Sequence, residues 1–364
     1  MTTTELDQPH LAAAPPELQL YSEPSPAHVP YRVPVARAFT DDERDELAEV
    51  LDVSTSPYRD YWAFHAEVRR LIDDGRIPAC LQEVCASART WDVRRDPIVF
   101  LRNCPTGDVP YLDFENPLES KYERKRDFIA EAFMTVFAEL HGSTVVTYRT
   151  ANRGDFFHDV HPLKNLQFSK SQKSVNTLPF HTDLPDNKVR PDWANLLYLR
   201  SSDRNEVYTA FVRLTDVVAA LDADVLATLR KPLFRVPRTR TENDINVYGL
   251  AEEGFLEWKP IIIPDRGYEY FCFNECLTVA DSREAQAAMA VLSNALQRIR
   301  HSIAMTERDF VACCNNTSMH ARHVVRITDW NEHQHRWVLK TWNVEDVALH
   351  QQHFVPGRNN VVDE

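Results

Sequence analysis

The chain has 364 residues, of which 43% are hydrophobic and 26% charged, and its formal net charge is −13. This length is enough to hold one large domain or two ordinary ones and to bury a core without disulfide support. The acidic balance argues against a nucleic-acid or anionic membrane surface, because both would require a basic face. We therefore expect a small-molecule or protein partner.

Cysteine usage and the first residues point to the compartment. The seven cysteines form no CxxC motif and no regular framework, which is typical of reduced cytosolic thiols. The first twenty residues have neither a basic segment nor an apolar one, and no apolar run approaches the about 18 residues of a membrane span. We expect a cytoplasmic protein, monomeric or homodimeric, with no membrane partner.

The first part of the chain predicts a tail and then helices. Residues 1–35 are rich in proline, alanine and small polar residues and lack an apolar period, so we expect a flexible tail. Residues 36–142 are expected to form a helical jacket with the first strands, beginning at the capping residue Thr40. Helices are expected at 40–53, 56–75 and 121–142, and strands at 96–104 and 143–150.

From residue 143 to about residue 350 the pattern changes to short strand-like runs. These runs occupy 155–160, 195–202, 208–214, 255–263, 268–273, 309–315, 323–328 and 335–344, and helical patches interrupt them at 215–230 and 283–300. Helices followed by many short strands are typical of a β-sandwich or barrel with helices outside. We expect one mainly β domain over residues 36–364.

Two segments place a histidine two residues before an acid. His65 and Glu67 lie in a predicted helix, where side chains at i and i+2 point about 200° apart and cannot meet at one ion. His181 and Asp183 lie in "LPFHTD", between two prolines that favour extended backbone. On an extended segment the two side chains share a face, so they can bind one metal ion.

A third ligand is needed to complete such a site. His320 follows a buried strand and a polar turn, and it would complete the two-histidine, one-carboxylate set of non-haem iron(II) oxygenases, which leaves positions open for small molecules. His323 is a weaker candidate because, three residues later on a strand, it faces the other way. His158 and His161 are expected in surface roles or behind the ligands.

Downstream, "HRWVLKTWNV" alternates so that Arg336, Val338 and Lys340 share one face. Two cations within an apolar strand are unusual. A buried guanidinium is suited to one carboxylate of a dianion such as 2-oxoglutarate, because it offers two parallel donors.

These motifs resemble the clavaminate-synthase-like Fe(II)/2-oxoglutarate oxygenases. The resemblance spans about residues 130–345 and is strongest to the free L-amino-acid hydroxylases of antibiotic biosynthesis, of the arginine 3-hydroxylase type. The segments that carry it are "SKSQKSVNTLPFHTD", "RPDWANLLYLRSS", "NNTSMHAR" and "HRWVLKTWNV".

The resemblance implies a double-stranded β-helix (jelly-roll) core at 143–350 with a lid near 184–192. It implies Fe(II) and 2-oxoglutarate as cofactors, with His181, Asp183 and His320 as iron ligands. Arg336 and Thr209 would then hold 2-oxoglutarate. The residues implied or proposed for the substrate are Lys340, Glu275, Ser171 and Arg190.

The implied activity is O2-dependent hydroxylation of an unactivated C–H bond in a free or modified L-amino acid. Desaturation or cyclisation by the same cofactors, a ligand-binding jelly roll without turnover, and a zinc hydrolase remain alternatives. The chain departs from the arginine hydroxylases at "FCFNEC", where one acid, Glu275, and Phe273 stand in place of two aspartates. This departure argues against arginine as the substrate.

Overall fold

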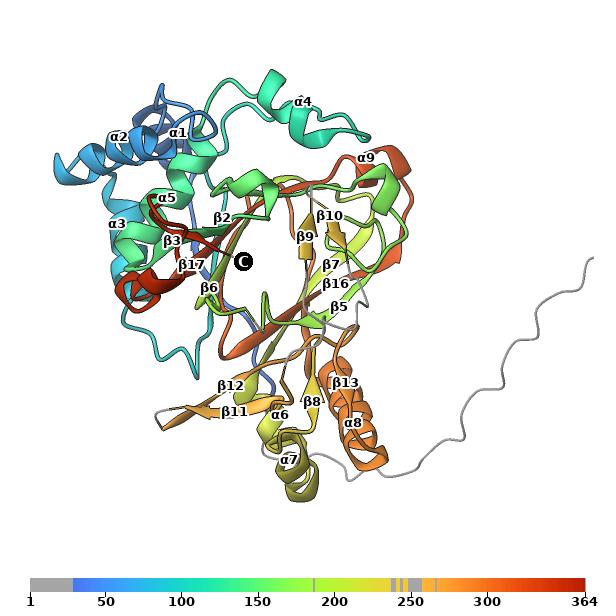
Figure 1. The fold of residues 1–364 in the computed structure, drawn as a ribbon. Coiled ribbons are helices and arrows are strands. Elements are labelled where there is room, and N and C mark those ends of the chain that lie inside the picture. The colour runs from blue at the N-terminus through green and yellow to red at the C-terminus, as the bar shows by residue number, and fades with distance from the viewer. Residues whose placement is uncertain are drawn as a thin grey trace, which may run out of the picture.

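The computed structural model describes residues 29–185, 187–236, 240–242, 245–247, 257–265 and 267–363, without the side chains of 240–247. Two β-sheets face each other across an apolar interior (Figure 1). The predicted mainly β fold with a jelly-roll core and flanking helices is confirmed.

The larger sheet has eight strands. Its order is β1 (Val35–Ala38), β2 (Ile98–Arg102), β15 (Phe310–Cys314), β6 (Trp193–Arg200), β17 (Trp337–Val344), β3 (Thr144–Tyr148) and β18 (Val361–Val362), with β4 (His158–Val160) also paired to β17. The smaller sheet runs β14 (His301–Ile303), β7 (Glu206–Arg213), β16 (Ser318–Arg326) and β5 (Leu178–His181).

Side-chain alternation along the strands explains how the large sheet is buried on both faces. In β2, Val99 and Leu101 pack against the helical side, whereas Ile98 and Phe100 point to the interior between the sheets. Tyr31 and Val33 are buried in that same interior. The packed structure therefore begins before residue 36, which was the expected start of the domain. The remainder of the predicted tail, residues 1–28, lies outside the described residues.

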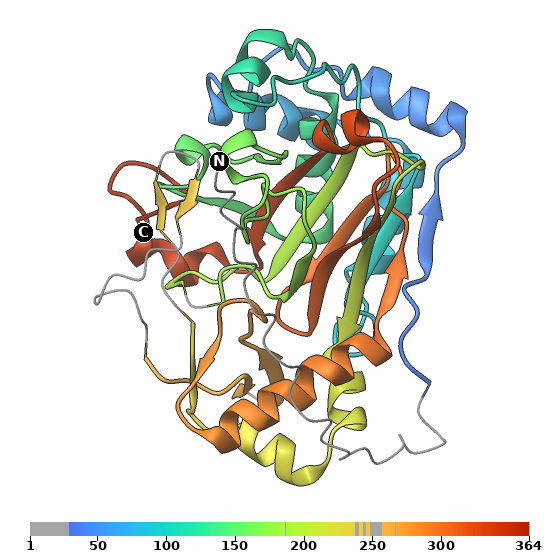
Figure 2. The ribbon, with the colours of Figure 1, turned by 90° about the vertical axis from the view of Figure 1, so that its right-hand side faces the viewer.

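Helices cover the larger sheet and one end of the smaller one (Figures 1 and 2). The first group is α1 (Asp41–Val50), α2 (Tyr61–Asp73), α3 (Ala79–Ala88), α4 (Pro117–Arg124) and α5 (Ile129–His141). The second group is α6 (Leu214–Ala220), α7 (Ala223–Leu229) and α8 (Arg283–Ile299), which pack with the smaller sheet in a second apolar cluster. A short helix, α9 (Trp330–Gln334), precedes β17.

Short hairpins and 3-10 turns complete the described chain. The paired strands are β8 (Phe234–Arg235) with β13 (Val279–Ala280), β9 (Arg240–Glu242) with β10 (Ile245–Val247), and β11 (Ile262–Asp265) with β12 (Tyr268–Phe271). The 3-10 turns are η1 (Asn152–Gly154), η2 (Lys164–Leu166) and η3 (Val347–His353). No helix in the parts of the chain described is long and apolar enough to span a membrane.

Three expectations about the elements were wrong. The helical patch expected at 215–230 is two helices, α6 and α7. The single helix expected at 121–142 is two helices, because Lys125 is extended (ψ 125°) and its buried ammonium lies 3.5 Å from the Glu131 carboxylate. The strand expected at 255–263 is β11 (Ile262–Asp265), and residues 255 and 256 lie outside the described residues.

Candidate metal centre and adjoining cavity

Strand pairing in the smaller sheet brings two distant histidines together. His181 ends β5 and is the register partner of His320 in β16, and the centres of their rings lie 4.4 Å apart. Asp183 follows two residues after His181, and its Oδ1 lies 3.6 Å from His181 Nε2. One ligand atom from each of the three residues lies within 4.8 Å of the other two. The structure therefore brings together the three residues that we predicted as a metal site.

The protonation of the two imidazoles suits a metal ion. His181 Nδ1 donates to the Pro179 carbonyl at 2.9 Å, which leaves Nε2 with a lone pair toward Asp183. Burial lowers the pKa of His181, and burial together with His181 lowers the pKa of His320 to about 3. Both rings are thus neutral near pH 7, as metal ligands must be.

Asp183 is charged although it is buried. Burial alone would raise its pKa, but the Lys340 ammonium, the two histidines and a hydrogen bond from Trp342 hold the pKa well below its ordinary value. Trp342 Nε1 donates to Asp183 Oδ2 at 2.8 Å, and Lys340 Nζ donates to the same oxygen at 3.2 Å.

The backbone of Asp183 is fixed by Asn315. The Asn315 side chain accepts from Asp183 N at 2.7 Å and donates to the Asp183 carbonyl at 2.9 Å. The same amide donates to the carbonyl of Pro191 at 2.9 Å, at the end of the predicted lid. Asn315 thus connects the segment that carries Asp183 to the turn that precedes His320.

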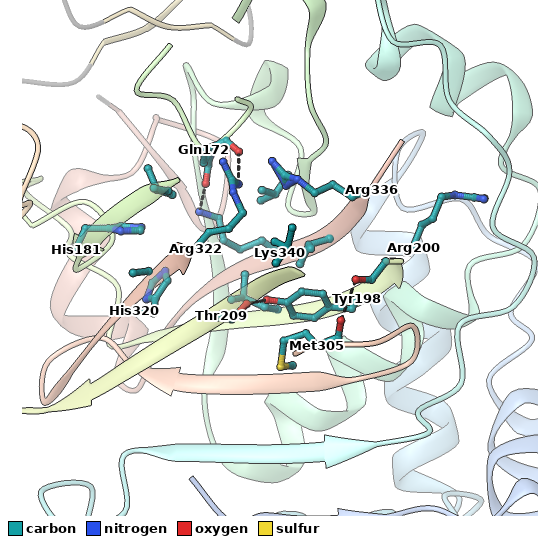
Figure 3. A pocket seen from close by; sticks show the side chains of 17 residues that line it. Gln172, His181, Tyr198, Arg200, Thr209, Met305, His320, Arg322, Arg336 and Lys340 are labelled. Carbon is teal, nitrogen blue, oxygen red and sulfur yellow. Dashed lines mark hydrogen bonds between the residues drawn. The ribbon is translucent and has the colours of Figure 1, made fainter. Parts of the chain in front are cut away.

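A cavity extends from the two histidines through the space between the sheets. Its lining is formed by Val160, Gln172, Leu178, His181, Leu196, Tyr198, Arg200, Ser201, Val207, Thr209, Met305, His320, Ala321, Arg322, Arg336, Val338 and Lys340. Figure 3 shows His181 and His320 at one end and Arg336 toward the other, with Lys340 between them. These lining residues include four cationic side chains and no acid, which predicts an anionic ligand.

Two guanidinium groups lie together in this cavity. Burial, followed by the charge of Arg322, holds the pKa of Arg336 well below its ordinary value, and burial lowers the pKa of Arg322 to about 10. Arg336 donates to the Ser174 carbonyl, but its buried Nε has no hydrogen-bond partner. Such an unpaired cationic donor is costly unless an anion fills the space beside it.

Thr209 and Lys340 also line the cavity. Thr209 lines the cavity on β7, opposite Arg322 in register, and its hydroxyl is 2.6 Å from the Tyr198 hydroxyl. Lys340 lines the cavity as well, with its ammonium 2.7 Å from Gln172 Oε1. The predicted alternation of β17 is confirmed, because Arg336, Val338 and Lys340 all face this cavity.

The other predicted substrate residues do not line this cavity. The Ser171 hydroxyl accepts from Lys173 N within its own loop, and Glu275 Oε2 accepts from Phe180 N at 3.0 Å. In the predicted lid, which is described except at residue 186, Arg190 donates to the Asn315 carbonyl at 2.9 Å and lies over the ring of Tyr270. Its Nε and Nη1 atoms are buried without partners.

The other candidate histidines from the sequence have different contacts. His65 contacts Glu139, whereas Glu67 accepts from the backbone of a preceding turn, so this pair points apart as expected. His158 and His161 are buried, so the expected surface role is wrong. The alternative role behind the ligands stays a prediction, and the ring of His158 lies 4.1 Å from that of Trp342, which donates to Asp183. His323 is not in the metal-ligand group found among the described residues.

Sequence reasoning missed three residues of the site. Arg322 is two residues after His320, and Trp342 is two after Lys340, so strand alternation could have identified both. Gln172, beside the predicted Ser171, is the loop residue that enters the cavity. It had no periodic signal, because it lies in an irregular loop.

No family model matches the chain. Clavaminate synthase 2 from Streptomyces clavuligerus is 25% identical over 293 residues, which cover 77% of this chain and 83% of the relative. The predicted resemblance to the clavaminate-synthase-like oxygenases is confirmed.

Solved structures share the fold of this chain. Asparagine oxygenase in complex with Fe(II), 2S,3S-3-hydroxyasparagine and succinate superposes with a TM-score of 0.76 at 17% identity, over 92% of this chain and 100% of that one. The non-heme iron oxygenase OrfP in complex with Fe and alpha-ketoglutaric acid gives a TM-score of 0.72 at 16% identity, over 90% and 99%.

Proposed function

We propose that this protein is an Fe(II)/2-oxoglutarate-dependent oxygenase that hydroxylates an unactivated C–H bond of a free or modified L-amino acid. The observation that carries the proposal is the cavity, with His181, Asp183 and His320 at one end and the unpaired donor of Arg336 toward the other. One dianion that chelates a metal ion and reaches a guanidinium would satisfy both ends. Two similar structures, one holding Fe(II) and succinate and the other Fe and alpha-ketoglutaric acid, support this choice of cofactors.

The donor set fits ferrous iron. Two neutral imidazoles and one carboxylate are the protein ligands of non-haem iron(II) oxygenases, and three coordination positions stay open. His181 Nε2, a ring nitrogen of His320 and Asp183 Oδ1 would hold the ion. When bound, iron with 2-oxoglutarate and O2 supplies oxidative decarboxylation to succinate and CO2 and the oxidant that attacks the C–H bond.

The residues of this chain would provide positioning and exclusion of water. Arg336 would bind the distal carboxylate of 2-oxoglutarate through charge-assisted hydrogen bonds, with the Thr209 hydroxyl beside it. The apolar lining, which includes Val160, Leu196 and Val338, would keep water from the cosubstrate. Residues 184–192 would close over the substrate as a lid.

The substrate itself is proposed by class. Arg190, Lys340, Glu275 and Ser171 were predicted around it, and these roles stay predictions. Glu275 already accepts from a backbone N–H, and Phe273 is fully buried, which supports a substrate other than arginine. We propose a cytoplasmic enzyme of specialised metabolism, such as antibiotic biosynthesis, that acts as a monomer or homodimer.

A turnover assay tests this proposal. The protein, loaded with Fe(II), is supplied with 2-oxoglutarate, O2 and a panel of amide, basic and other L-amino acids, and succinate is measured. We expect one class of amino acid to accelerate succinate release and to gain one oxygen atom. Loss of two hydrogen atoms instead would identify a desaturase or cyclase. Conversion without O2 or 2-oxoglutarate would contradict the proposal and favour a hydrolase.

A further inference from the structure

The two oxygens of the Asp183 carboxylate have different surroundings. Oδ2 accepts two hydrogen bonds from β17, one from Trp342 Nε1 at 2.8 Å and one from Lys340 Nζ at 3.2 Å. Oδ1 instead faces the imidazole of His181, whose Nε2 lies 3.6 Å away. Because Oδ2 is occupied by two donors, Oδ1 is the oxygen available to a metal ion.

The ammonium of Lys340 is already surrounded by partners. Besides Asp183 Oδ2, it donates to Gln172 Oε1 at 2.7 Å and lies 4.5 Å from the centre of the Trp342 ring. The side chain is only 3% exposed. An ammonium has three N–H donors, and two acceptors and a π face use most of this capacity. Lys340 is therefore poorly placed to bind the carboxylate of a substrate.

Strand geometry explains why both donors reach one oxygen. Lys340 and Trp342 are two residues apart on β17, so their side chains leave the same face of the sheet. The strand is held in register on one side by β6, where Leu196 and Ala194 are their partners. The two donors are thus fixed by the centre of the large sheet, and Asn315 fixes the backbone of Asp183.

We propose that Lys340 and Trp342 are positioning residues that hold Asp183 as a one-oxygen metal ligand. The inference rests on the proposed function only in naming the ion as Fe(II). It replaces the predicted role of Lys340 as an anchor for the substrate carboxylate. A carboxylate that bound the ion through both oxygens would occupy one of the positions that the cosubstrate and O2 require. Restraining Oδ2 prevents this.

Metal affinity measured without cosubstrate or substrate tests the inference, because a substrate anchor has no effect under those conditions. Anaerobic calorimetry with Fe(II), or with Co(II) as a stable substitute, is applied to the wild type, Lys340→Met and Trp342→Phe. Residues that orient metal ligands typically change metal affinity by about 10- to 100-fold, and we expect a loss of this size for Lys340→Met. Lys231→Met, which removes an exposed lysine paired with Glu284, is the matched control.

Trp342→Phe provides an independent test in case Lys340→Met does not fold. Phenylalanine keeps a ring beside Tyr148 and His158 and removes the indole N–H donor. We expect weaker Co(II) binding in this variant and a change in the intensity of the cobalt visible bands, which depends on coordination number. Thermal unfolding of the metal-free proteins shows whether each variant is folded.

The opposite result would assign Lys340 to the substrate. If both folded variants bind Co(II) as tightly as the wild type, with the same visible bands, the inference is overturned. A raised substrate KM in Lys340→Met would then restore the anchor role. Failure of the proposed function has a different signature, because the wild type itself would release no succinate with any amino acid while the difference in Co(II) affinity could persist.

Discussion

His181 and His320 are register partners on adjacent antiparallel strands, although 139 positions separate them in the sequence. A slip of one residue between β5 and β16 would turn one of the rings to the other face of the sheet. The metal centre is therefore a direct product of strand register in the smaller sheet.

This register predicts which late histidine binds the metal ion. His320→Ala should abolish measurable Fe(II) binding in anaerobic calorimetry, because one of the three protein ligands is lost. His323→Ala on the same strand is the matched control and should bind Fe(II) like the wild type, because His323 packs near Phe180 instead. The reverse pattern would show that the ligand was misassigned.

Arg336 should determine affinity for the cosubstrate. Arg336→Met removes a buried cation with an unpaired donor, so the Kd of 2-oxoglutarate should rise by at least about tenfold, which corresponds to about 1.4 kcal/mol. Fe(II) affinity should stay unchanged. Arg204→Met, at an exposed arginine paired with Asp329, serves as the control. Equal 2-oxoglutarate affinity in Arg336→Met and wild type would remove Arg336 from this role.

Arg322 should stabilise the loop that covers the cavity. Its guanidinium donates to the carbonyls of Gln172, Ser174 and Asn176, at distances between 2.8 and 3.1 Å. Arg322→Met would leave several carbonyls without donors, and we expect the free energy of unfolding in urea to fall by about 2 to 4 kcal/mol. Arg326→Met, on the exposed end of the same strand, should change it by less than about 0.5 kcal/mol. Similar losses in both variants would contradict the role of Arg322.

Buried neutral histidines should make the fold sensitive to mild acid. Burial lowers the pKa of His141, His161 and His333 to about 4 in each case. Between about pH 6.5 and 4 these histidines bind protons in the unfolded chain but not in the folded chain. The stability that the neutral buried histidines contribute is therefore present above pH 6.5 and is lost as the pH falls. Each histidine should cost up to about 1.4 kcal/mol per pH unit in that window.

Urea unfolding at pH 7.0, 6.0 and 5.0 checks this dependence. His141→Gln should lose less stability over this range than the wild type, because one of the three groups no longer titrates. The ring of His141 stacks on Phe137 and meets Trp193 edge-on, so the variant is also expected to be less stable at pH 7.0. A pH dependence identical to that of the wild type would show that His141 is not a source of the acid sensitivity.

The sequence predicted the parts of this site that depend on local periodicity. The alternation of β17 placed Arg336 and Lys340 on one face, and the extended segment before Asp183 allowed a two-residue chelate. The convergence of His320 with this pair depends on sheet register, which local pattern does not specify. The strand and turn before His320 made it a candidate, and the family resemblance implied the same residue. The resemblance also led to Ser171 where Gln172 enters the cavity, since an irregular loop has no periodic side-chain direction.

Other differences follow from long-range contacts. The role of Glu275 at the substrate stays a prediction, and an isolated bridge between His181 and Asn274 brings its carboxylate to the backbone of Phe180. The helix expected at 121–142 is interrupted because Lys125 reaches a buried carboxylate, a contact that an apolar period does not reveal. A tertiary partner outweighs the local helical preference at Lys125.

The central claim is that one cavity binds ferrous iron at His181, Asp183 and His320 and a dicarboxylate between that ion and Arg336. Anaerobic titration of the Fe(II) protein with 2-oxoglutarate, followed by visible absorption, tests it most directly. We predict a metal-to-ligand charge-transfer band that saturates at one equivalent in the wild type, needs more 2-oxoglutarate in Arg336→Met and is absent in His320→Ala. A wild type that binds Fe(II) but develops no such band, or a band that persists in His320→Ala, would contradict the account.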